Sequence, residues 1–237
     1  MTLNIDKINY TTIHPQLNNK NNNQTQVTTT QKIASVLGCS TGIISTLALV
    51  AKKKNPDIFE HLKQPEDLIK TLKNLELNGK DVITIATGAI TGGFAGGSIT
   101  DKKNTKAKAK EGIVQLLGNY IIPTLFVGAG IKFNKALNKK FAYPPVNKLI
   151  QFAFGMSSLI VGVIVGNSIS KDINQRIFHE NCNRKLNWKD WILQFDNVCL
   201  VTSVSNEGTK LAQIVSKAIP VSHIIPGYLT GIKKDNK

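Results

Sequence analysis

The chain has 237 residues, of which 41% are hydrophobic, and it carries 30 Lys and Arg against 15 Asp and Glu, a formal net charge of +15. This apolar content is too high for a wholly disordered protein, and the length suffices for one large domain or two modest ones. The positive charge favours partners that bear phosphate, either nucleic acid or anionic lipid head groups. The 3 cysteines are widely spaced, which excludes a readable disulfide framework or zinc ribbon.

The N-terminal segment, residues 1–32, is rich in Asn, Thr and Gln and contains few large apolar residues. Such a segment cannot bury enough surface to offset the entropy of ordering, so we expect a disordered polar tail. It also lacks the apolar core of a cleavable secretory signal. Any insertion into a membrane must therefore use internal segments.

Four long stretches without a charged residue follow the tail. A helix at the surface of a soluble protein carries charges on its polar face, whereas a helix that crosses a bilayer needs about 20 mainly apolar residues in succession. A bilayer explains all four stretches together, and a fifth stretch, interrupted by a lysine, a histidine and two prolines, is a weaker candidate. The predicted spans are about 33–51, 82–100, 112–131, 149–170 and 211–232. We expect an all-α fold, a multi-pass transmembrane helical bundle with glycine-zipper helices, in a membrane domain over 33–234.

Two further helices are expected outside the spans. Leucines at near-helical spacing with charges between them predict a soluble amphipathic helix over about 65–78. Trp188, Trp191 and Phe195 share one face of a second predicted helix, over about 187–200. Tryptophans at head-group level are typical of an interfacial helix, and a helix docked on a soluble core is the alternative.

The stretch TGAITGGFAGGSIT, residues 87–100, contains five glycines and follows a β-branched run. It resembles the TGxxxGxG loop of short-chain dehydrogenases, whose glycines let the backbone approach a pyrophosphate. Phe94, however, stands where that motif requires its last glycine, and the chain has no Tyr-x-x-x-Lys pair. A nucleotide-binding loop is therefore disfavoured, and a helix notched by glycines is the better interpretation.

The glycines of this stretch recur at helical spacing. Gly88, Gly92 and Gly96 are four residues apart and form a ridge without side chains. Because the hydrophobic effect does not drive helices together in lipid, close backbone approach at such ridges supplies much of the attraction. Gly162 and Gly166 repeat the spacing in the fourth predicted span. We therefore expect these five glycines to pack helices together, and the two glycine helices to contact each other.

Two pairs of segments also resemble each other within the chain. GGFAGGSITDKKN from Gly92 matches GVIVGNSISKDIN from Gly162, and IIPTLFVG from Ile121 matches IIPGYLTG from Ile224. The order of the matches predicts a duplicated two-helix hairpin. Internal repeats of this kind occur in transporter folds and also in membrane proteins that transport nothing.

Five polar residues stand among apolar ones as candidate intramembrane positions. Gln115, Asn119 and His223 are expected to form hydrogen bonds between helices, with contact to a substrate as the second role. A transporter would need a polar cavity around Asn119, Asn167 and His223. Asp196 is a carboxylate beside apolar residues, which suits a proton or cation path, a contact with head groups or the cap of a helix.

No catalytic, cofactor or metal site is predicted. His179 and Cys182 have a spacing that can clasp a metal, but no second ligand pair stands near them in the sequence. The basic run DKKNTKAKAKEG, residues 101–112, contains no aromatic residue and no recognition-helix pattern. We expect this run to lie at lipid phosphates and not on nucleic acid.

The pattern GGFAGGSITDKKN, GNYIIP, FDNVCL and PGYLTGIKK resembles an uncharacterised family of small multi-pass membrane proteins from gut bacteria related to cyanobacteria, over roughly residues 33–234. The resemblance implies a bacterial origin and brings no known activity. We expect a non-enzymatic structural or interaction component of the bacterial inner (cytoplasmic) membrane, with a lipid bilayer and a homo-oligomer as partners. The alternatives are a small transporter or channel and, from another class, a soluble basic protein that binds nucleic acid.

Overall fold

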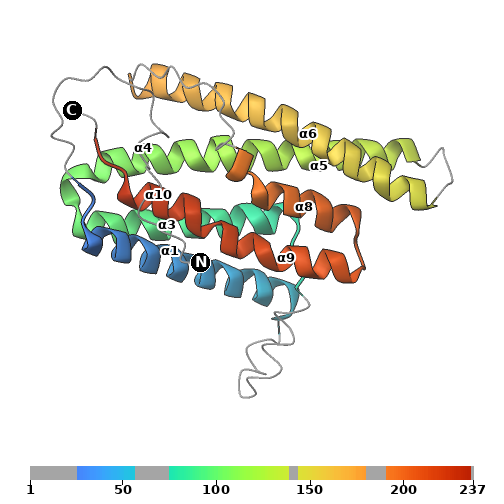
Figure 1. Cartoon of the computed structure of the whole chain (residues 1–237), viewed down its shortest axis with the longest axis horizontal. Coiled ribbons are helices and arrows are strands. Elements are labelled where there is room, and N and C mark those ends of the chain that lie inside the picture. The colour runs from blue at the N-terminus through green and yellow to red at the C-terminus, as the bar shows by residue number, and fades with distance from the viewer. Residues whose placement is uncertain (1–25, 57–74, 139–143, 180–190, 236–237) are drawn as a thin grey trace, which may run out of the picture.

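The computed structural model describes residues 26–56, 75–138, 144–179 and 191–235, and all the regular structure in these ranges is helical (Figure 1). The all-α prediction is confirmed. Three short segments differ from the α-helical pattern: η5 is a 3₁₀-helix, and η6 and η7 are π-helical. The elements are α1 (Thr29–Lys54), α3 (Gly79–Thr100), η5 (Lys102–Asn104), α4 (Thr105–Gln115), η6 (Leu116–Ile121), α5 (Ile122–Asn138), α6 (Pro144–Asp172), η7 (Ile173–Ile177), α8 (Phe195–Ser205), α9 (Lys210–Ser222) and α10 (Ile224–Ile232).

Four helices in the described part of the chain are long and apolar enough to cross a membrane. They are α1, α3, the continuous helix from η5 to α5, and α6 with η7, and they contain the first four predicted spans. The fifth predicted span, 211–232, is divided into α9 and α10 at His223, and Pro220 lies inside α9. Each half is shorter than a bilayer crossing requires, so this segment differs from the other four.

The first helix begins within the segment predicted as a polar tail. The side chain of Thr28 accepts a hydrogen bond from the backbone N–H of Gln31, and the Gln31 side chain accepts one from the backbone N–H of Thr28. This capping box satisfies two free N–H groups at the start of α1. Residues 29–32 therefore belong to the helix, and residues 1–25 lie outside the described part.

Most of the predicted amphipathic helix over 65–78 also lies outside the described residues. The described part, 75–78, is not helical. Leu77 is buried in the core, and Asn78 caps α3 by accepting hydrogen bonds from the backbone N–H groups of Lys80 and Asp81. The chain thus enters α3 through a buried leucine and a polar cap.

One glycine ridge of α3 lies against α1. The two helices run in opposite directions, with Gly88 opposite Gly42 and Gly92 opposite Gly38. A Cβ atom built on Gly92 would overlap the carbonyl oxygen of Gly38, and one on Gly96 would overlap the backbone of α1 in the same way. The backbones are so close that only glycine fits at these contacts.

A second ridge of α3 lies against α10. Gly93 faces Gly227 and Gly97 faces Gly231, so the two helices run in the same direction. Added Cβ atoms at Gly93 and Gly97 would overlap the carbonyl oxygens opposite them. Helix α3 is therefore held on two sides by backbone contact. In Figure 1, α10 lies beside α3 and α4, and α8 lies beside α5 and α6.

The glycines of α6 have different partners from those of α3. Gly166 lies against Gly118 in η6, and Gly162 lies against Pro123 and Phe126. The main partners of α6 are α5 and η6, whereas those of α3 are α1 and α10, so the expected contact between the two glycine helices was wrong. Glycines four residues apart allow any helix backbone to approach closely, so their spacing does not identify which helix is the partner.

The internal sequence repeat is not matched by a repeated arrangement. The predicted units are α3 with α5 and α6 with α10, so if a two-fold axis related them, the pair of α3 with α10 would correspond to the pair of α6 with α5. The first pair is parallel, with Gly97 beside Gly231, but the second is antiparallel, with Gly118 beside Gly166 and Gly130 beside Ser158. The similar segments therefore share a packing requirement and not an equivalent place in the bundle.

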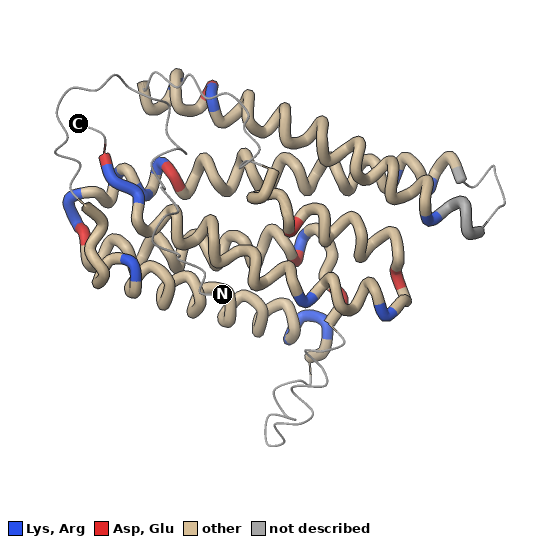
Figure 2. Tube along the Cα trace, viewed as in Figure 1, with Lys and Arg blue, Asp and Glu red and all other residues tan. Residues whose placement is uncertain are grey.

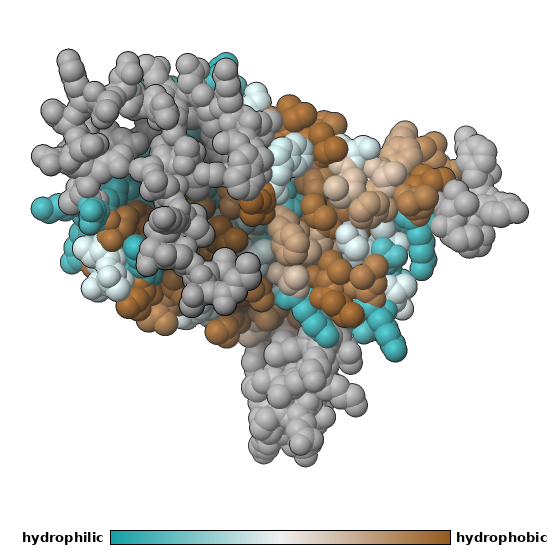
Figure 3. Space-filling model, in the orientation of Figure 1, coloured by the Kyte–Doolittle hydropathy of each residue, from teal (hydrophilic) through white to brown (hydrophobic). Residues whose placement is uncertain are grey.

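Charged residues gather at the helix ends, and the long middle parts of the helices are nearly free of them (Figure 2). Large apolar side chains are exposed along the outer faces, including Leu37 (63%) and Ile44 (67%) on α1 and Ile164 (51%) on α6. On the face in Figure 3, hydrophobic residues occupy most of the described middle and hydrophilic ones lie toward the ends. This distribution is the one that helices need in order to cross a bilayer.

The α1–α3 contact predicts unequal effects of two glycine-to-alanine substitutions. Gly92→Ala forces a Cβ into the backbone of α1 and should lower the free energy of unfolding by about 1–3 kcal/mol, as overpacking does. Gly128→Ala is the control, because a Cβ there meets no atom within 4 Å and replaces a helical glycine. Thermal unfolding of the detergent-purified variants measures both, and equal midpoints would contradict the close contact.

Candidate functional site: a polar centre in the bundle

Polar side chains meet inside the bundle where three helical segments are irregular. Helix α4 passes into α5 through the π-helical turns of η6, α8 starts after a turn at residues 193–194, and α9 gives way to α10 at His223. Hydrogen bonds and ring contacts join these three places. We call the set the polar centre, and its members are Gln115, Asn119, Tyr120, Thr124, Gln194, Asp196, Asn197 and His223.

A chain of side-chain amides runs along α4 and η6. Gln115 Nε2 donates to Glu111 Oε1 at 2.7 Å, and Asn119 Nδ2 donates to Gln115 Oε1. Gln194 Nε2 then lies 3.5 Å from Asn119 Oδ1. Glu111, Gln115 and Asn119 follow each other every fourth position and are therefore neighbours on one face of the helix.

Asn197 joins α8 to both η6 and α5. Its Nδ2 donates to Gln194 Oε1 at 2.8 Å and to the backbone oxygen of Asn119 at 3.2 Å, and its Oδ1 accepts from Thr124 Oγ1 at 3.0 Å. The side chain has no exposed surface. Buried amides that are satisfied in this way hold helices together, at about 0.6 kcal/mol per bond in membrane proteins.

His223 lies at the break between α9 and α10 and is fully buried. Its Nε2 is 3.3 Å from the carbonyl oxygen of Val82, and its Nδ1 is 3.3 Å from Ser222 Oγ. The ring centroid of Tyr120 is 5.0 Å from that of His223, at an interplanar angle of 50°. The histidine thus connects the broken helix to α3 and to η6.

Asp196 differs from the other members because its carboxyl has no hydrogen-bond partner among the described residues, although only 1% of the residue is exposed. It lies in the first turn of α8 but does not cap that helix, since the cap residue is Gln194. Burial raises the pKa of the Asp196 carboxyl to about 8, against the opposing effect of the backbone N–H groups of Asn197 and Asp196. Its electrostatic neighbours are Tyr120 and Cys199.

The structure describes only part of the interfacial helix predicted over 187–200. Residues 187–190, with Trp188, lie outside the described part, and α8 itself begins at Phe195. Trp191 and Phe195 are exposed on the outer face, but the opposite face is buried against α9, α6 and α5. The helix therefore packs into the bundle through a mixed face: Cys199, Leu200 and Val201 join the hydrophobic core, and Asn197 finds hydrogen-bond partners on η6 and α5.

Two of the sequence candidates lie apart from the polar centre. Asn167 is half-buried on α6, one residue after the Gly166 contact, and does not join the amide chain. His179 lies at the end of the described range, and Cys182 lies beyond it. Among the described residues no three His, Cys, Asp or Glu side chains form a group that could hold a metal.

The sequence did not reveal Gln194, Asn197, Thr124 or Tyr120 as members. A detectable signal was the run QFDN, which places three polar residues around one aromatic just before an apolar segment. Gln115 and Asn119 were recognised as polar residues among apolar ones, but their bond to each other was not predicted. The pairing of α8 with η6 joins residues more than 70 positions apart, such as Thr124 and Asn197, and no local pattern encodes it.

An ion pair links the amide chain to one end of the bundle. Lys233 Nζ lies 3.0 Å from Glu111 Oε2, and Glu111 is also the acceptor for Gln115. Glu111 is thus shared between a charge at the end of α10 and the first amide of the interior chain. The polar groups extend without interruption from this end of the bundle to Thr124.

A second ion pair changes the expectation for the basic run. Lys108 is fully buried, and its Nζ lies 2.9 Å from Asp101 Oδ2. Burial acts to raise the pKa of the Asp101 carboxyl, but hydrogen bonds from Lys108 and Asn104 and the charge of Lys108 outweigh it and hold that pKa below its usual range. At least one lysine of the run therefore stabilises the turn after α3 and does not face lipid phosphates.

Comparisons of the chain with models of known protein families, with curated proteins and with solved structures find no match. The chemistry of the site therefore has to be argued from its residues. A buried carboxyl beside amides, a phenol and an imidazole can bind a proton or a small cation. The same amides, where they satisfy each other, serve helix packing.

A double-mutant cycle tests the bond between Thr124 and Asn197. Thr124→Val and Asn197→Leu should each destabilise the protein by about 1–3 kcal/mol, because each leaves a buried partner unsatisfied. The double variant should lose less than the sum, with a coupling of about 0.5–1.5 kcal/mol in thermal or denaturant unfolding in detergent. Thr124→Val combined with Asn206→Ala, just after α8, is the control, and its two destabilisations should add. If the destabilisations of Thr124→Val and Asn197→Leu also simply add, the bond between these residues is contradicted.

Proposed function

We propose that this chain is an integral membrane protein of a bacterial inner membrane, and that its polar centre moves a small ion across the bilayer as a transporter or channel. The observation that carries the proposal is the meeting of buried polar side chains with three irregular helical segments inside a bundle of apolar helices. Ionisable and polar groups are costly inside a membrane, and they commonly mark ion pathways. We propose no catalytic role.

The irregular segments support transport more than simple packing. π-Helical turns are rare and are frequent at functional sites. Helices that break within a membrane protein expose backbone groups, which are tolerated where they line a site, and ion-binding sites of many transporters are built at such breaks. The break at His223 and the turns of η6 lie side by side, with the rings of His223 and Tyr120 5.0 Å apart.

The membrane part of the proposal is tested by an alkaline carbonate wash of membranes from cells that express the chain. We expect the protein to stay in the pellet, because its exposed apolar faces need hydrocarbon, and to sediment with the inner membrane on a density gradient. Release into the supernatant would contradict the proposal and favour the soluble nucleic-acid-binding alternative.

The transport part is tested in liposomes that contain the purified protein and report internal pH or a trapped cation under an imposed membrane potential. We expect a flux above that of protein-free liposomes, and a loss of most of it in Asn119→Leu and His223→Leu. Glu207→Gln is the control, because Glu207 is exposed in the turn between α8 and α9. A wild-type flux equal to that of empty liposomes for protons, sodium and potassium would reject transport.

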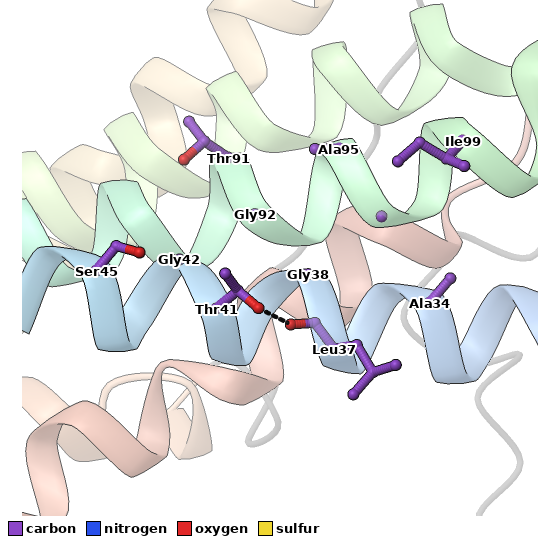
Figure 4. A pocket seen from close by; sticks show the side chains of 11 residues that line it. Ala34, Leu37, Gly38, Thr41, Gly42, Ser45, Thr91, Gly92, Ala95 and Ile99 are labelled. Carbon is purple, nitrogen blue, oxygen red and sulfur yellow. Dashed lines mark hydrogen bonds between the residues drawn. The ribbon is translucent and has the colours of Figure 1, made fainter.

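The second candidate is a structural or interaction component, and a groove on the outer face of α1 and α3 favours it (Figure 4). The groove has a volume of about 500 Å³ and is lined by small residues, among them Thr41, Ser45, Thr91 and Ala95. Small residues on an outward face allow another helix to approach closely. We propose a second copy of this chain as the occupant. Thr41→Leu, which fills the groove, should then shift cross-linked dimers in membranes toward monomer.

Lipid head groups are the other proposed partner. Lys102, Lys103 and Lys106 are exposed at the end of the bundle where α3 meets α4. Exposed lysines next to apolar helices attract anionic head groups, at about 1 kcal/mol for each lysine near the surface. We expect contact with anionic lipid and none with nucleic acid.

A further inference from the structure

We infer that Asp196 is the proton-binding site of the polar centre: its carboxyl is protonated in the packed bundle, and it gives up and takes back one proton. The inference rests on the proposed ion transport and names the ion. In this step the O–H bond of the carboxyl breaks, the electron pair stays on the carboxylate, and water or a buffer base takes the proton. No other bond changes.

The carboxyl of Asp196 is buried away from any side chain of the described residues that could pair with it. Both oxygens are buried and neither has a hydrogen-bond partner in the described part of the chain. The backbone N–H groups of Asn197 and Asp196 act on this carboxyl, but burial outweighs them. A buried carboxylate without a paired cation is far more costly than the neutral acid. The group therefore either takes up a proton or needs a cation beside it.

The charges on the surrounding helices do not supply that cation. The groups that act on Asp196 or lie next to it are the phenol of Tyr120 on η6, the thiol of Cys199 on α8 and, beyond Tyr120, the imidazole of His223. No described lysine or arginine contributes to its titration. The lysines of α5, α9 and the first turns of α6 are exposed, and these are Lys132, Lys135, Lys148, Lys210 and Lys217.

The local chemistry favours a proton over a metal cation. A sodium or calcium ion needs several oxygen ligands, often including more than one carboxylate. Asp196 is the one carboxylate among the residues of the polar centre. Two carboxylates near it in the described part of the chain already have a lysine partner: Glu111 is paired with Lys233, and the buried Asp81 is paired with Lys54. A single carboxyl among amides and a phenol suits a proton.

Asp196 lies in the first turn of α8, between exposed and buried positions. Phe195 and Trp191 are 52% and 41% exposed, whereas Gln194, which lies between them in the sequence, is buried. The first turn of a helix lacks part of its internal hydrogen bonding and opens more readily than its middle. A local opening of this turn would let water reach Asp196 without separating the α3 contacts.

Infrared difference spectroscopy of the full chain in liposomes tests the inference directly. Wild type should show the C=O stretch of a protonated carboxyl at pH 6, lost with a midpoint near the pKa of about 8 that burial gives this group. Labelling with ¹³C-aspartate should shift the band, and Asp196→Asn should abolish it while Glu207→Gln keeps it. The absence of an aspartate band that titrates above pH 6 would overturn the inference.

The pH dependence of stability is the second measurement. Because the folded protein holds this proton at pH values where the unfolded chain has lost it, unfolding releases no proton at low pH and one proton between about pH 4 and 8. The melting temperature of wild type should therefore fall as the pH rises through this interval, and Asp196→Asn should lose that part of the fall. An unchanged slope in Asp196→Asn would also overturn the inference.

The two proposals fail separately. A missing titration with normal liposome flux rejects Asp196 as the proton site but keeps transport. A clear titration without flux rejects transport and leaves a buried proton-binding group. If sodium, and not pH, abolishes the aspartate band, the ligand is a cation and the inference is wrong.

Discussion

The arrangement depends on how closely the backbone of α3 approaches its neighbours. Helices surrounded by hydrocarbon gain nothing from hiding apolar surface from water, so their attraction comes from dispersion and weak hydrogen bonds, which fall off steeply with distance. Glycines on two faces of α3 bring α1 and α10 to backbone contact. The contact with α10 also holds His223, at the break between α9 and α10, beside the carbonyl oxygen of Val82 in α3. The position of the polar centre thus follows from the glycine ridges.

The exclusion of water also determines how the polar centre is built. Where water is excluded, each amide and hydroxyl has to find its partner within the protein. The chain from Glu111 through Asn119 and Asn197 to Thr124 meets that requirement. Asp196 does not, although it lies next to Asn197 in sequence. We infer that its carboxyl takes up a proton instead of a hydrogen-bond partner.

The sequence predicted the features that depend on composition along one helix. The positions of the four apolar helices and the ridge of Gly88, Gly92 and Gly96 follow from local composition and spacing, because each is a property of one segment. The partner of a ridge is not local, and α6 was wrongly paired with α3 for that reason. The inward face of α8 was missed because Trp191 and Phe195 dominate its pattern, whereas the partners of its polar side come from η6.

A membrane-spanning bundle requires hydrocarbon around the exposed apolar faces of α1 and α6. Spin labels on single cysteines at Leu37 and Ile164 measure this directly, through their collision rates with oxygen, which concentrates in lipid, and with a water-soluble nickel complex. With the native cysteines replaced, the account predicts frequent collisions with oxygen and few with nickel at both sites in liposomes, and the reverse at Glu207. Nickel collision rates at Leu37 and Ile164 as high as those at Glu207 would contradict it.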